Sequence, residues 1–170
     1  MHSFSVVVMG VAGCGKSSLG REVAAKLGWP MVEGDDFHGP ENKALMAAGT
    51  PLTDANRAGW LDTLAAELGR YPGGVVLSCS ALKQRYRDQL RAASTGLRFV
   101  YLELSPEAAL ARVSGRGGGH FFPAALVASQ FEGLETPAAE RGVLCLDATL
   151  SLDALLEAAL DWIHHERSPR

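Results

Sequence analysis

The octapeptide Gly-Val-Ala-Gly-Cys-Gly-Lys-Ser at positions 10–17 constrains the fold more than any other part of this 170-residue sequence. It fits the pattern G-x-x-x-x-G-K-S/T, and it lies between an apolar, β-branched run at 5–9 and an amphipathic stretch at 17–27. Glycines allow backbone N–H groups to turn inward around phosphate oxygens, and a helix N-terminus adds the positive end of its dipole. The sequence therefore predicts a strand, a phosphate-binding loop and a helix in succession. The expected phosphate contacts are Gly10, Gly13, Cys14, Gly15, Lys16, Ser17 and Ser18.

The last two residues of this loop carry most of its chemistry. We expect Lys16 to bridge the β- and γ-phosphates of a nucleotide, and the Ser17 hydroxyl to ligate magnesium. ATP and Mg2+ are therefore the expected cofactors. Cys14 is more typical of a small space-filling residue than of a reactive thiol.

The rest of the chain alternates short apolar runs with helical patterns. The apolar runs lie at 30–33, 74–79, 97–102 and 142–146, and the helical patterns at 42–48, 54–69, 82–93, after Ser105, and at 152–163. Such alternation predicts an α/β fold of three layers, a five-stranded parallel sheet with helices on both faces. Neither a repeat nor a long linker divides the chain, so one domain is expected over residues 1–170. Four glycines with an arginine and a histidine at 114–120 predict a short mobile lid at about 114–122.

Composition excludes several classes of protein. The chain is 47% hydrophobic and 21% charged, which is typical of a globular protein, and its net charge of −3 argues against a protein that coats nucleic acid. Neither an apolar run long enough to cross a membrane nor a signal peptide is found. Three scattered cysteines suit a reducing cytoplasm, and Cys79 and Cys145 are expected in the core because they fall on predicted buried strands.

The residues after the second strand indicate which phosphate chemistry to expect. A regulatory GTPase needs N-K-x-D to read guanine, and the Asn-Lys pair at 42–43 lacks that aspartate. A small-molecule kinase binds its acceptor at the carboxyl ends of neighbouring strands, where Glu33, Asp35 and Asp36 are expected. Asp35 is the predicted acid that orients or deprotonates an acceptor hydroxyl, and either Glu33 or Asp36 is placed to assist magnesium through water.

Several short blocks resemble the gluconate kinase family. They are G-D-D-F-H at 34–38, C-S-A-L-K at 79–83, Y-R-D at 86–88, H-F-F at 120–122 and S-Q-F-E at 129–132. They occur in the family order from about Val6 to Asp147, and their combination is far more specific than the phosphate loop. The resemblance implies a fold like that of nucleoside monophosphate kinases. It also implies a cytoplasmic, homodimeric enzyme that uses ATP and magnesium to convert D-gluconate into 6-phospho-D-gluconate.

The resemblance implies roles that can be checked against the chemistry of a carboxylate on a polyol. Arg57 offers a planar fork for the carboxylate, and His38 offers a hydrogen bond to a hydroxyl. Lys83 is placed to neutralise developing charge, Arg116 to close over the γ-phosphate, and Arg112 to contact the nucleotide, for example by stacking on adenine. The expected catalytic residues are Lys16, Asp35, Lys83 and Arg116, and the resemblance adds Arg87, His120 and Gln130 as further substrate contacts.

The sequence departs from the family pattern at a few positions, and two other functions stay open. Glu33 stands where the family usually has Asp, Gly39 where it has Pro and Leu45 where it has Lys, and the lid has one extra residue. One alternative is a kinase of the same fold for another small hydroxy acid such as shikimate, against which the C-S-A-L-K block argues. The other is a nucleotide-dependent switch module without an acceptor, against which the acidic segment and the predicted lid argue.

Overall fold

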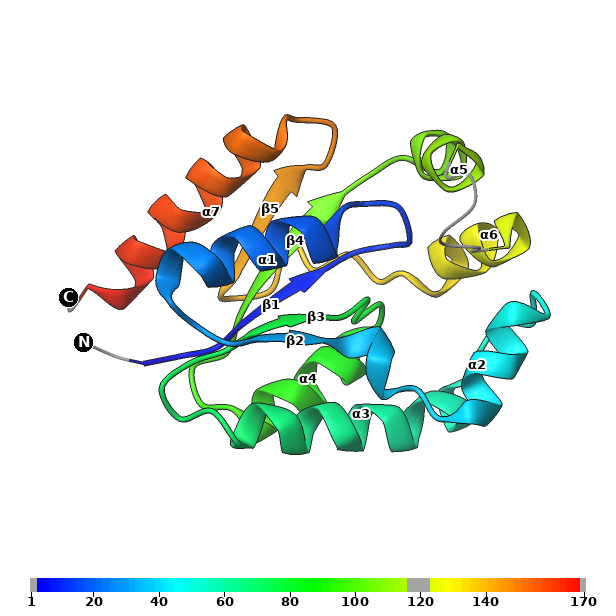
Figure 1. Ribbon diagram of the computed structural model, residues 1–170, viewed down its shortest axis with the longest axis horizontal. Helices are drawn as coiled ribbons and strands as arrows, with labels where there is room; N and C mark the ends of the chain where they lie inside the picture. The colour runs from blue at the N-terminus through cyan, green and yellow to red at the C-terminus, as the bar shows by residue number, and fades with distance from the viewer. Residues whose placement is uncertain (1–2, 116–122, 169–170) are drawn as a thin grey trace.

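The apolar runs of the sequence form five parallel strands in one sheet (Figure 1). The computed structural model describes residues 3–115 and 123–168. The strand order is β2-β3-β1-β4-β5, so β1 lies at the centre, paired with β3 and β4. The predicted α/β class and five-stranded parallel sheet are confirmed. The strands are β1 (Val6–Met9), β2 (Met31–Glu33), β3 (Val76–Ser78), β4 (Arg98–Glu103) and β5 (Val143–Asp147).

Helices cover both faces of the sheet, which gives the predicted three layers. Figure 1 shows α1 and α7 on one face and α3 and α4 on the other. In the described part of the chain, no helix is both long and apolar enough to cross a membrane. The helices are α1 (Lys16–Leu27), a 3-10 turn η1 (Gly34–Phe37), α2 (Pro40–Ala47), α3 (Asp54–Gly69), α4 (Gln84–Ala93), α5 (Pro106–Ser114), α6 (Ala124–Gly133) and α7 (Leu152–Arg167).

Strand β1 shows how one apolar run supplies two cores. Successive side chains of a strand point to opposite faces. Val6 and Val8 therefore join the core beneath α1 and α7, whereas Val7 and Met9 join the core above α3 and α4. All four side chains are fully buried, so the carboxyl end of β1 is held in place from both sides.

The helix ends follow their local sequence signals. The Thr53 hydroxyl accepts from the Asn56 N–H, and the Asn56 side chain accepts from the Thr53 N–H, which closes a capping box at the start of α3. The hydroxyls of Ser105 and Ser151 cap α5 and α7, each accepting from the N–H three residues later. Helix α4 begins two residues later than the 82–93 pattern predicts. Ala81 adopts a positive φ of 46° and Lys83 is extended, so residues 79–83 run as a loop.

The prediction that Cys145 is a core residue is wrong. Cys145 lies on β5, which is the edge strand of the sheet, and its side chain is exposed. The sequence pattern of a buried strand does not reveal that a strand lies at the edge, where helices cover it less completely. Cys79 at the end of β3 is buried as expected.

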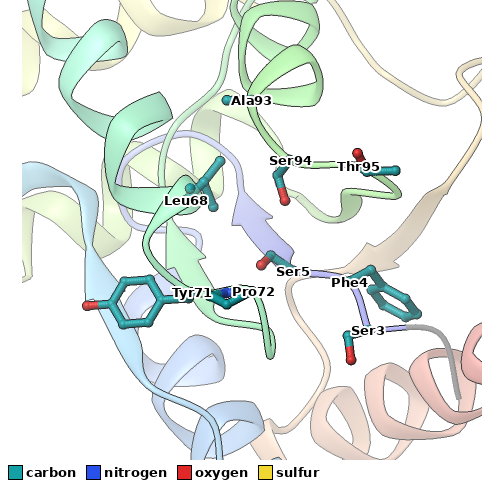
Figure 2. Close-up of a pocket in the computed structure, with 10 residues that line it drawn as sticks. Ser3, Phe4, Ser5, Leu68, Tyr71, Pro72, Ala93, Ser94 and Thr95 are labelled. Atoms are coloured by element: carbon teal, nitrogen blue, oxygen red, sulfur yellow. The ribbon is translucent and has the colours of Figure 1, made fainter.

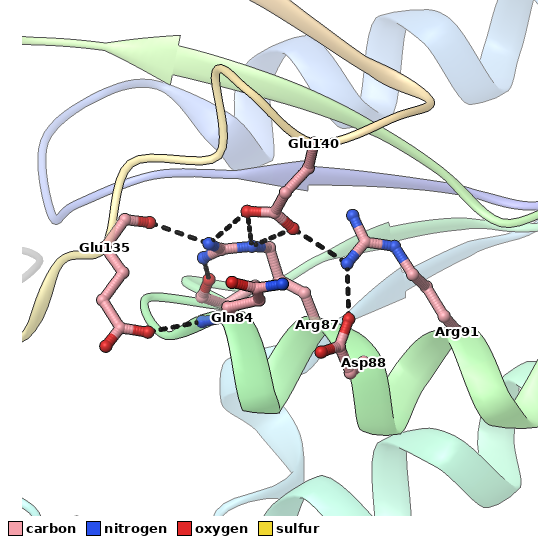
Figure 3. A network of polar contacts seen from close by, with 7 residues as sticks. Gln84, Arg87, Asp88, Arg91, Glu135 and Glu140 are labelled. Carbon is pink, nitrogen blue, oxygen red and sulfur yellow. Dashed lines mark hydrogen bonds and ion pairs between the residues drawn. The ribbon is translucent and has the colours of Figure 1, made fainter.

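Arg87 holds α4 against the segment that follows α6, as Figure 3 shows. Its guanidinium is fully buried and donates to both carboxylate oxygens of Glu140, with the shortest bond at 2.6 Å. Its other bonds go to the carbonyl oxygens of Ala81, at 2.7 Å, and Glu135, at 2.8 Å. All these donors serve the protein itself, so the expectation that Arg87 binds substrate is wrong.

Replacing Arg87 with methionine should destabilise the fold strongly. The variant leaves the partly buried Glu140 carboxylate with Arg91 as its remaining partner, and it leaves two carbonyl groups without their donor. Breaking such a buried pair costs about 3 kcal/mol or more. Urea unfolding measures the change. Arg70→Met is the control, because Arg70 pairs with Glu67 at the surface, where an ion pair adds little. Equal unfolding midpoints for the two variants would contradict this account of Arg87.

Candidate active site

Two hollows lie at opposite edges of the sheet, and their chemistry differs. The smaller, of about 220 Å³, lies near the amino ends of the strands, between the residues before β1 and the ends of α3 and α4 (Figure 2). None of the described side chains that line it is charged. The larger is a cleft of about 890 Å³ at the carboxyl edge. In open α/β sheets ligands bind at this edge, so the larger cleft is the candidate site.

The segments that follow three neighbouring strands form the cleft. The phosphate loop follows β1, η1 follows β2, and Ser80 follows β3. Helices α2, α3 and α6 and the loop residues Pro51 and Leu52 also contribute to its walls. Among the described residues, the charged or histidine side chains that line it are Lys16, Arg21, Glu33, Asp35, Asp36, His38, Lys43 and Arg57.

The phosphate loop takes its shape from glycines that no other residue can replace without strain. Gly10 has a φ of 149°, and a Cβ there would lie 2.7 Å from Cys14 Sγ and 2.9 Å from the Leu102 carbonyl oxygen. Gly15, directly before α1, has a φ of 92°. Cys14 is 1% exposed and fills the space beneath Gly10, in agreement with the predicted packing role. The loop is therefore built on the carboxyl end of β1, in a shape that its glycines set.

Lys16 and Ser17 open α1 at the base of the cleft. Burial alone would lower the pKa of Lys16, but acidic neighbours that include Asp35 and Glu33 outweigh it, and the pKa lies above its usual value. Lys16 therefore stays a cation. The Ser17 hydroxyl lies 3.3 Å from that of Ser78, which ends β3.

The oxygen ligands in the cleft suit magnesium. Among the described residues, no three histidine, cysteine or acidic side chains converge on one point to hold a metal by themselves. Mg2+ commonly binds through one or two protein oxygens together with waters and nucleotide phosphates. The Ser17 hydroxyl and the carboxylates of Glu33 and Asp36 line the same cleft and provide such oxygens.

Asp35 is placed by a close approach between η1 and β3. A Cβ on Gly34 would lie 2.4 Å from the Ser78 carbonyl oxygen, so only glycine fits there. Trp60 Nε1 on α3 donates to the Gly34 carbonyl at 2.8 Å and fixes the same turn from the other side. The turn leaves Asp35 and Asp36 exposed in the cleft.

His38 and Arg57 line the cleft where η1 and α3 meet. The His38 ring stacks on Trp60 with ring centroids 4.2 Å apart and is 7% exposed. Burial lowers the pKa of His38, and the cations Arg57 and Lys43 lower it further against the opposite effect of Asp35. Arg57 lies over the Tyr86 ring, 5.9 Å from its centroid, and makes no ion pair within the described part of the chain. A ligand carboxylate in the cleft therefore has a cation available.

Lys83 does not line the cleft, contrary to its expected role at the reacting phosphoryl group. Its ammonium group donates to the Asp54 carboxylate at 3.0 and 3.3 Å. Arg85 and the Tyr86 hydroxyl bind the same carboxylate, and together with Lys83 they hold the pKa of Asp54 far below its usual range. The sequence could not reveal this because Asp54 and Lys83 are far apart in the chain.

Arg112 and Gln130 contact the phosphate loop from two other helices. Arg112 donates to the carbonyl oxygens of Gly13, at 3.0 Å, and Ala148, at 2.8 Å, and so links the loop to the segment after β5. The Gln130 side chain lines the cleft and accepts from the Ala12 N–H at 2.6 Å. In this structure both side chains bind the loop itself. Arg116 and His120 lie outside the described residues, as does most of the predicted lid.

Arg21 is a cleft residue that the sequence analysis missed. It lies on α1 four residues after Ser17, and residues four apart share one face of a helix. This spacing was a usable signal. Trp60 and Ser80 also line the cleft, but only the tertiary structure brings them there.

Comparison with known proteins agrees with this geometry. Residues 12–141 match the family model for shikimate kinase. A gluconokinase of Gluconobacter oxydans is 41% identical over 156 residues, which cover 89% of this chain and 86% of that protein. The thermosensitive gluconokinase of Escherichia coli is 42% identical over 143 residues, which cover 82% and 76%. The chain belongs to the gluconokinase family.

The gluconokinase resemblance extends to the three-dimensional structure. The crystal structure of a gluconokinase from Sinorhizobium meliloti superimposes with a TM-score of 0.89 at 41% identity, and covers 96% of this chain and 93% of that one. The protein is therefore a P-loop kinase, and the alternative of a switch module without an acceptor is not favoured.

Lys16→Ala should abolish most phosphoryl transfer in this gluconokinase-family enzyme. The Lys16 cation opens α1 in the loop that is expected to cradle phosphate, and the loss of a charge placed to stabilise the transition state costs about 100-fold or more in turnover. ADP release measures the loss, and circular dichroism checks the fold. Lys26→Ala, in the exposed last turn of the same helix, is the control and should keep full activity. Near-normal turnover of the Lys16 variant would contradict the assignment of the loop.

Proposed function

We propose that this enzyme transfers the γ-phosphoryl group of ATP to D-gluconate, giving 6-phospho-D-gluconate and ADP. One observation carries the proposal. A single cleft joins the phosphate loop to both an acid and a cation on the acceptor side, namely Asp35 and Arg57. Gluconate has a carboxylate at one end and a primary hydroxyl at the other, so it needs these two groups in one site. The gluconokinases with which the chain shares 41% and 42% identity support the same substrate.

In the proposed reaction the acceptor oxygen attacks the γ-phosphorus as the bond to the β–γ bridging oxygen breaks. Asp35 accepts the hydroxyl proton, and Lys16 stays close to the charge that moves onto the leaving phosphate. Ser17 would hold the magnesium ion with help from Glu33 or Asp36, and the ion would neutralise phosphate charge. Arg57 holds the far end of the acceptor by a charge-assisted, two-pronged bond.

We also propose that one domain over residues 1–170 carries out the whole reaction and that the enzyme works in the cytoplasm. The three free cysteines are consistent with a reducing compartment.

A panel of hydroxy acids tests the substrate directly. ADP release from ATP and magnesium should depend on added gluconate and should be much weaker with shikimate, the acceptor suggested by the matching family model. A higher kcat/KM for shikimate than for gluconate would overturn the proposal and favour the second acceptor.

Asp35→Asn should lower kcat with little change in ATP affinity. The amide keeps the size of the carboxylate but cannot accept the proton, and loss of a general base costs about 100-fold or more. Steady-state kinetics and calorimetric titration with an ATP analogue separate the two effects. Asp62→Asn is the control, because this α3 carboxylate binds Gln89 outside the cleft. Unchanged kcat in the Asp35 variant would show that another group takes the proton.

Arg57→Met should raise the KM for gluconate by about tenfold or more and leave kcat nearly unchanged, because the bond to the carboxylate is present in both ground and transition states. A hexitol without the carboxylate should be a poor substrate for the wild type. It should be only slightly poorer than gluconate for the variant.

Arg85→Met is the matched control for this experiment. Arg85 contacts the same Tyr86 ring, 5.5 Å from its centroid, but does not line the cleft. Its KM should match that of the wild type. If Arg57→Met still discriminates against the hexitol as strongly as the wild type does, the carboxylate is held elsewhere, with Lys43 the next candidate in the cleft.

A further inference from the structure

A buried asparagine contacts the histidine that lines the cleft. His38 follows η1, and Asn42 lies four residues later in the first turn of α2. The Asn42 side chain is 8% exposed and does not line the cleft, whereas His38 does. The contact of Asn42 with the cleft therefore runs through His38.

The hydrogen bonds of Asn42 define which of its atoms faces the histidine. Asn42 Nδ2 lies 2.9 Å from the carbonyl oxygen of Asn56. A carbonyl oxygen only accepts, so the atom that faces it must be the amide nitrogen. The same nitrogen lies 3.2 Å from His38 Nδ1. Its second N–H therefore points to a ring nitrogen that has to accept.

This geometry determines the protonation state of the His38 ring. If Nδ1 accepts from Asn42, it carries no proton, so the single proton of the neutral ring lies on Nε2. An imidazolium would place an N–H of the ring against an N–H of the amide. Burial, the largest effect on this ring, lowers the pKa of His38 and so also disfavours the imidazolium; Asp35 acts in the opposite direction, and Arg57 and Lys43 add to the lowering. Trp60, stacked on the ring, is uncharged.

Nε2 is left available to a ligand. It has no hydrogen-bond partner among residues 3–115 and 123–168, and it is not sealed from solvent. We propose that Asn42 is a positioning residue that locks His38 as the neutral tautomer with its proton on Nε2, so that His38 presents only a hydrogen-bond donor to the acceptor substrate. The inference rests on the proposed function for the identity of that substrate.

The fixed tautomer of His38 separates hydrogen-bond donation from proton acceptance within the site. A donor-only His38 binds an oxygen with a free lone pair, such as a hydroxyl or carboxylate oxygen of the sugar acid, and it cannot take the proton from the attacking hydroxyl. That task is left to Asp35. The same hydrogen bonds connect His38 to Arg57. The carbonyl that orients Asn42 belongs to Asn56, which directly precedes Arg57, and the Asn56 side chain closes the capping box of α3.

Nitrogen NMR of the free wild-type enzyme tests the tautomer without any substrate. The ¹⁵N shifts of a histidine ring distinguish a protonated from an unprotonated nitrogen, and a His38→Gln sample assigns the signals. At about pH 7 we expect Nδ1 to be unprotonated and Nε2 protonated. A protonated Nδ1 would overturn the proposal, whatever the enzyme phosphorylates.

Asn42→Asp tests the consequence for substrate binding. The carboxylate would accept from Nδ1–H, so it should raise the pKa of His38 and stabilise the opposite tautomer. Below the raised pKa the imidazolium still donates from Nε2, and KM for gluconate should stay near that of the wild type. Above it Nε2 loses its proton, and KM should rise by roughly tenfold, the scale of one lost hydrogen bond, with kcat changed much less. The wild-type KM should be flat over the same pH range.

Asn42→Ala is the matched control, because it removes the hydrogen bond to His38 Nδ1 without favouring the opposite tautomer. Its KM should rise modestly and without the pH-dependent step. The same pH-independent rise in both variants would mean that Asn42 has only a packing role, and would overturn the proposal. If gluconate is not the substrate, the KM measurements give no result, but the ¹⁵N shifts still determine the tautomer. If Asn42→Asp does not fold, the wild-type shifts decide it alone.

Discussion

The site depends on the burial of β1 on both faces of the sheet. Its four side chains are fully buried, and its backbone pairs with β3 on one side and β4 on the other. The phosphate loop begins where this strand ends, and Cys14 from the loop returns beneath Gly10. A loop anchored in this way keeps its N–H groups oriented before a nucleotide binds, which lowers the entropy cost of binding.

Ion pairing within the protein decides which cations remain for the substrate. Asp54 binds Lys83 and Arg85, and Glu140 binds Arg87 and Arg91. Arg57 is different, because it faces the cleft and makes no ion pair within residues 3–115 and 123–168. The number of basic residues near the site therefore does not show how many cations a ligand can reach. The arrangement of nearby carboxylates determines which basic side chains stay available.

The errors of the sequence-based predictions have physical causes of the same kind. Lys83 and Arg87 occur in blocks that resemble a kinase family, and this resemblance predicts that both side chains contact the substrate. Whether a cation faces a ligand or an internal carboxylate depends on residues such as Asp54 and Glu140, which are 29 and 53 positions away. Cys145 was placed in the core because its strand is apolar, but the position of a strand within the sheet is set by topology and not by its own residues.

By itself, the sequence determined the elements whose causes are local. The phosphate loop follows from its glycines, the strands and helices from their apolar periods, and the starts of α3, α5 and α7 from the capping residues Thr53, Ser105 and Ser151. It also placed Asp35, because the segment after a parallel strand must lie at the carboxyl edge. Only the tertiary structure decided the pairing of Lys83 with Asp54, the stacking of His38 on Trp60, and the contact of Asn42 with the Asn56 carbonyl. These contacts join separate elements, and their geometry depends on how the helices pack, which no local pattern of residues records.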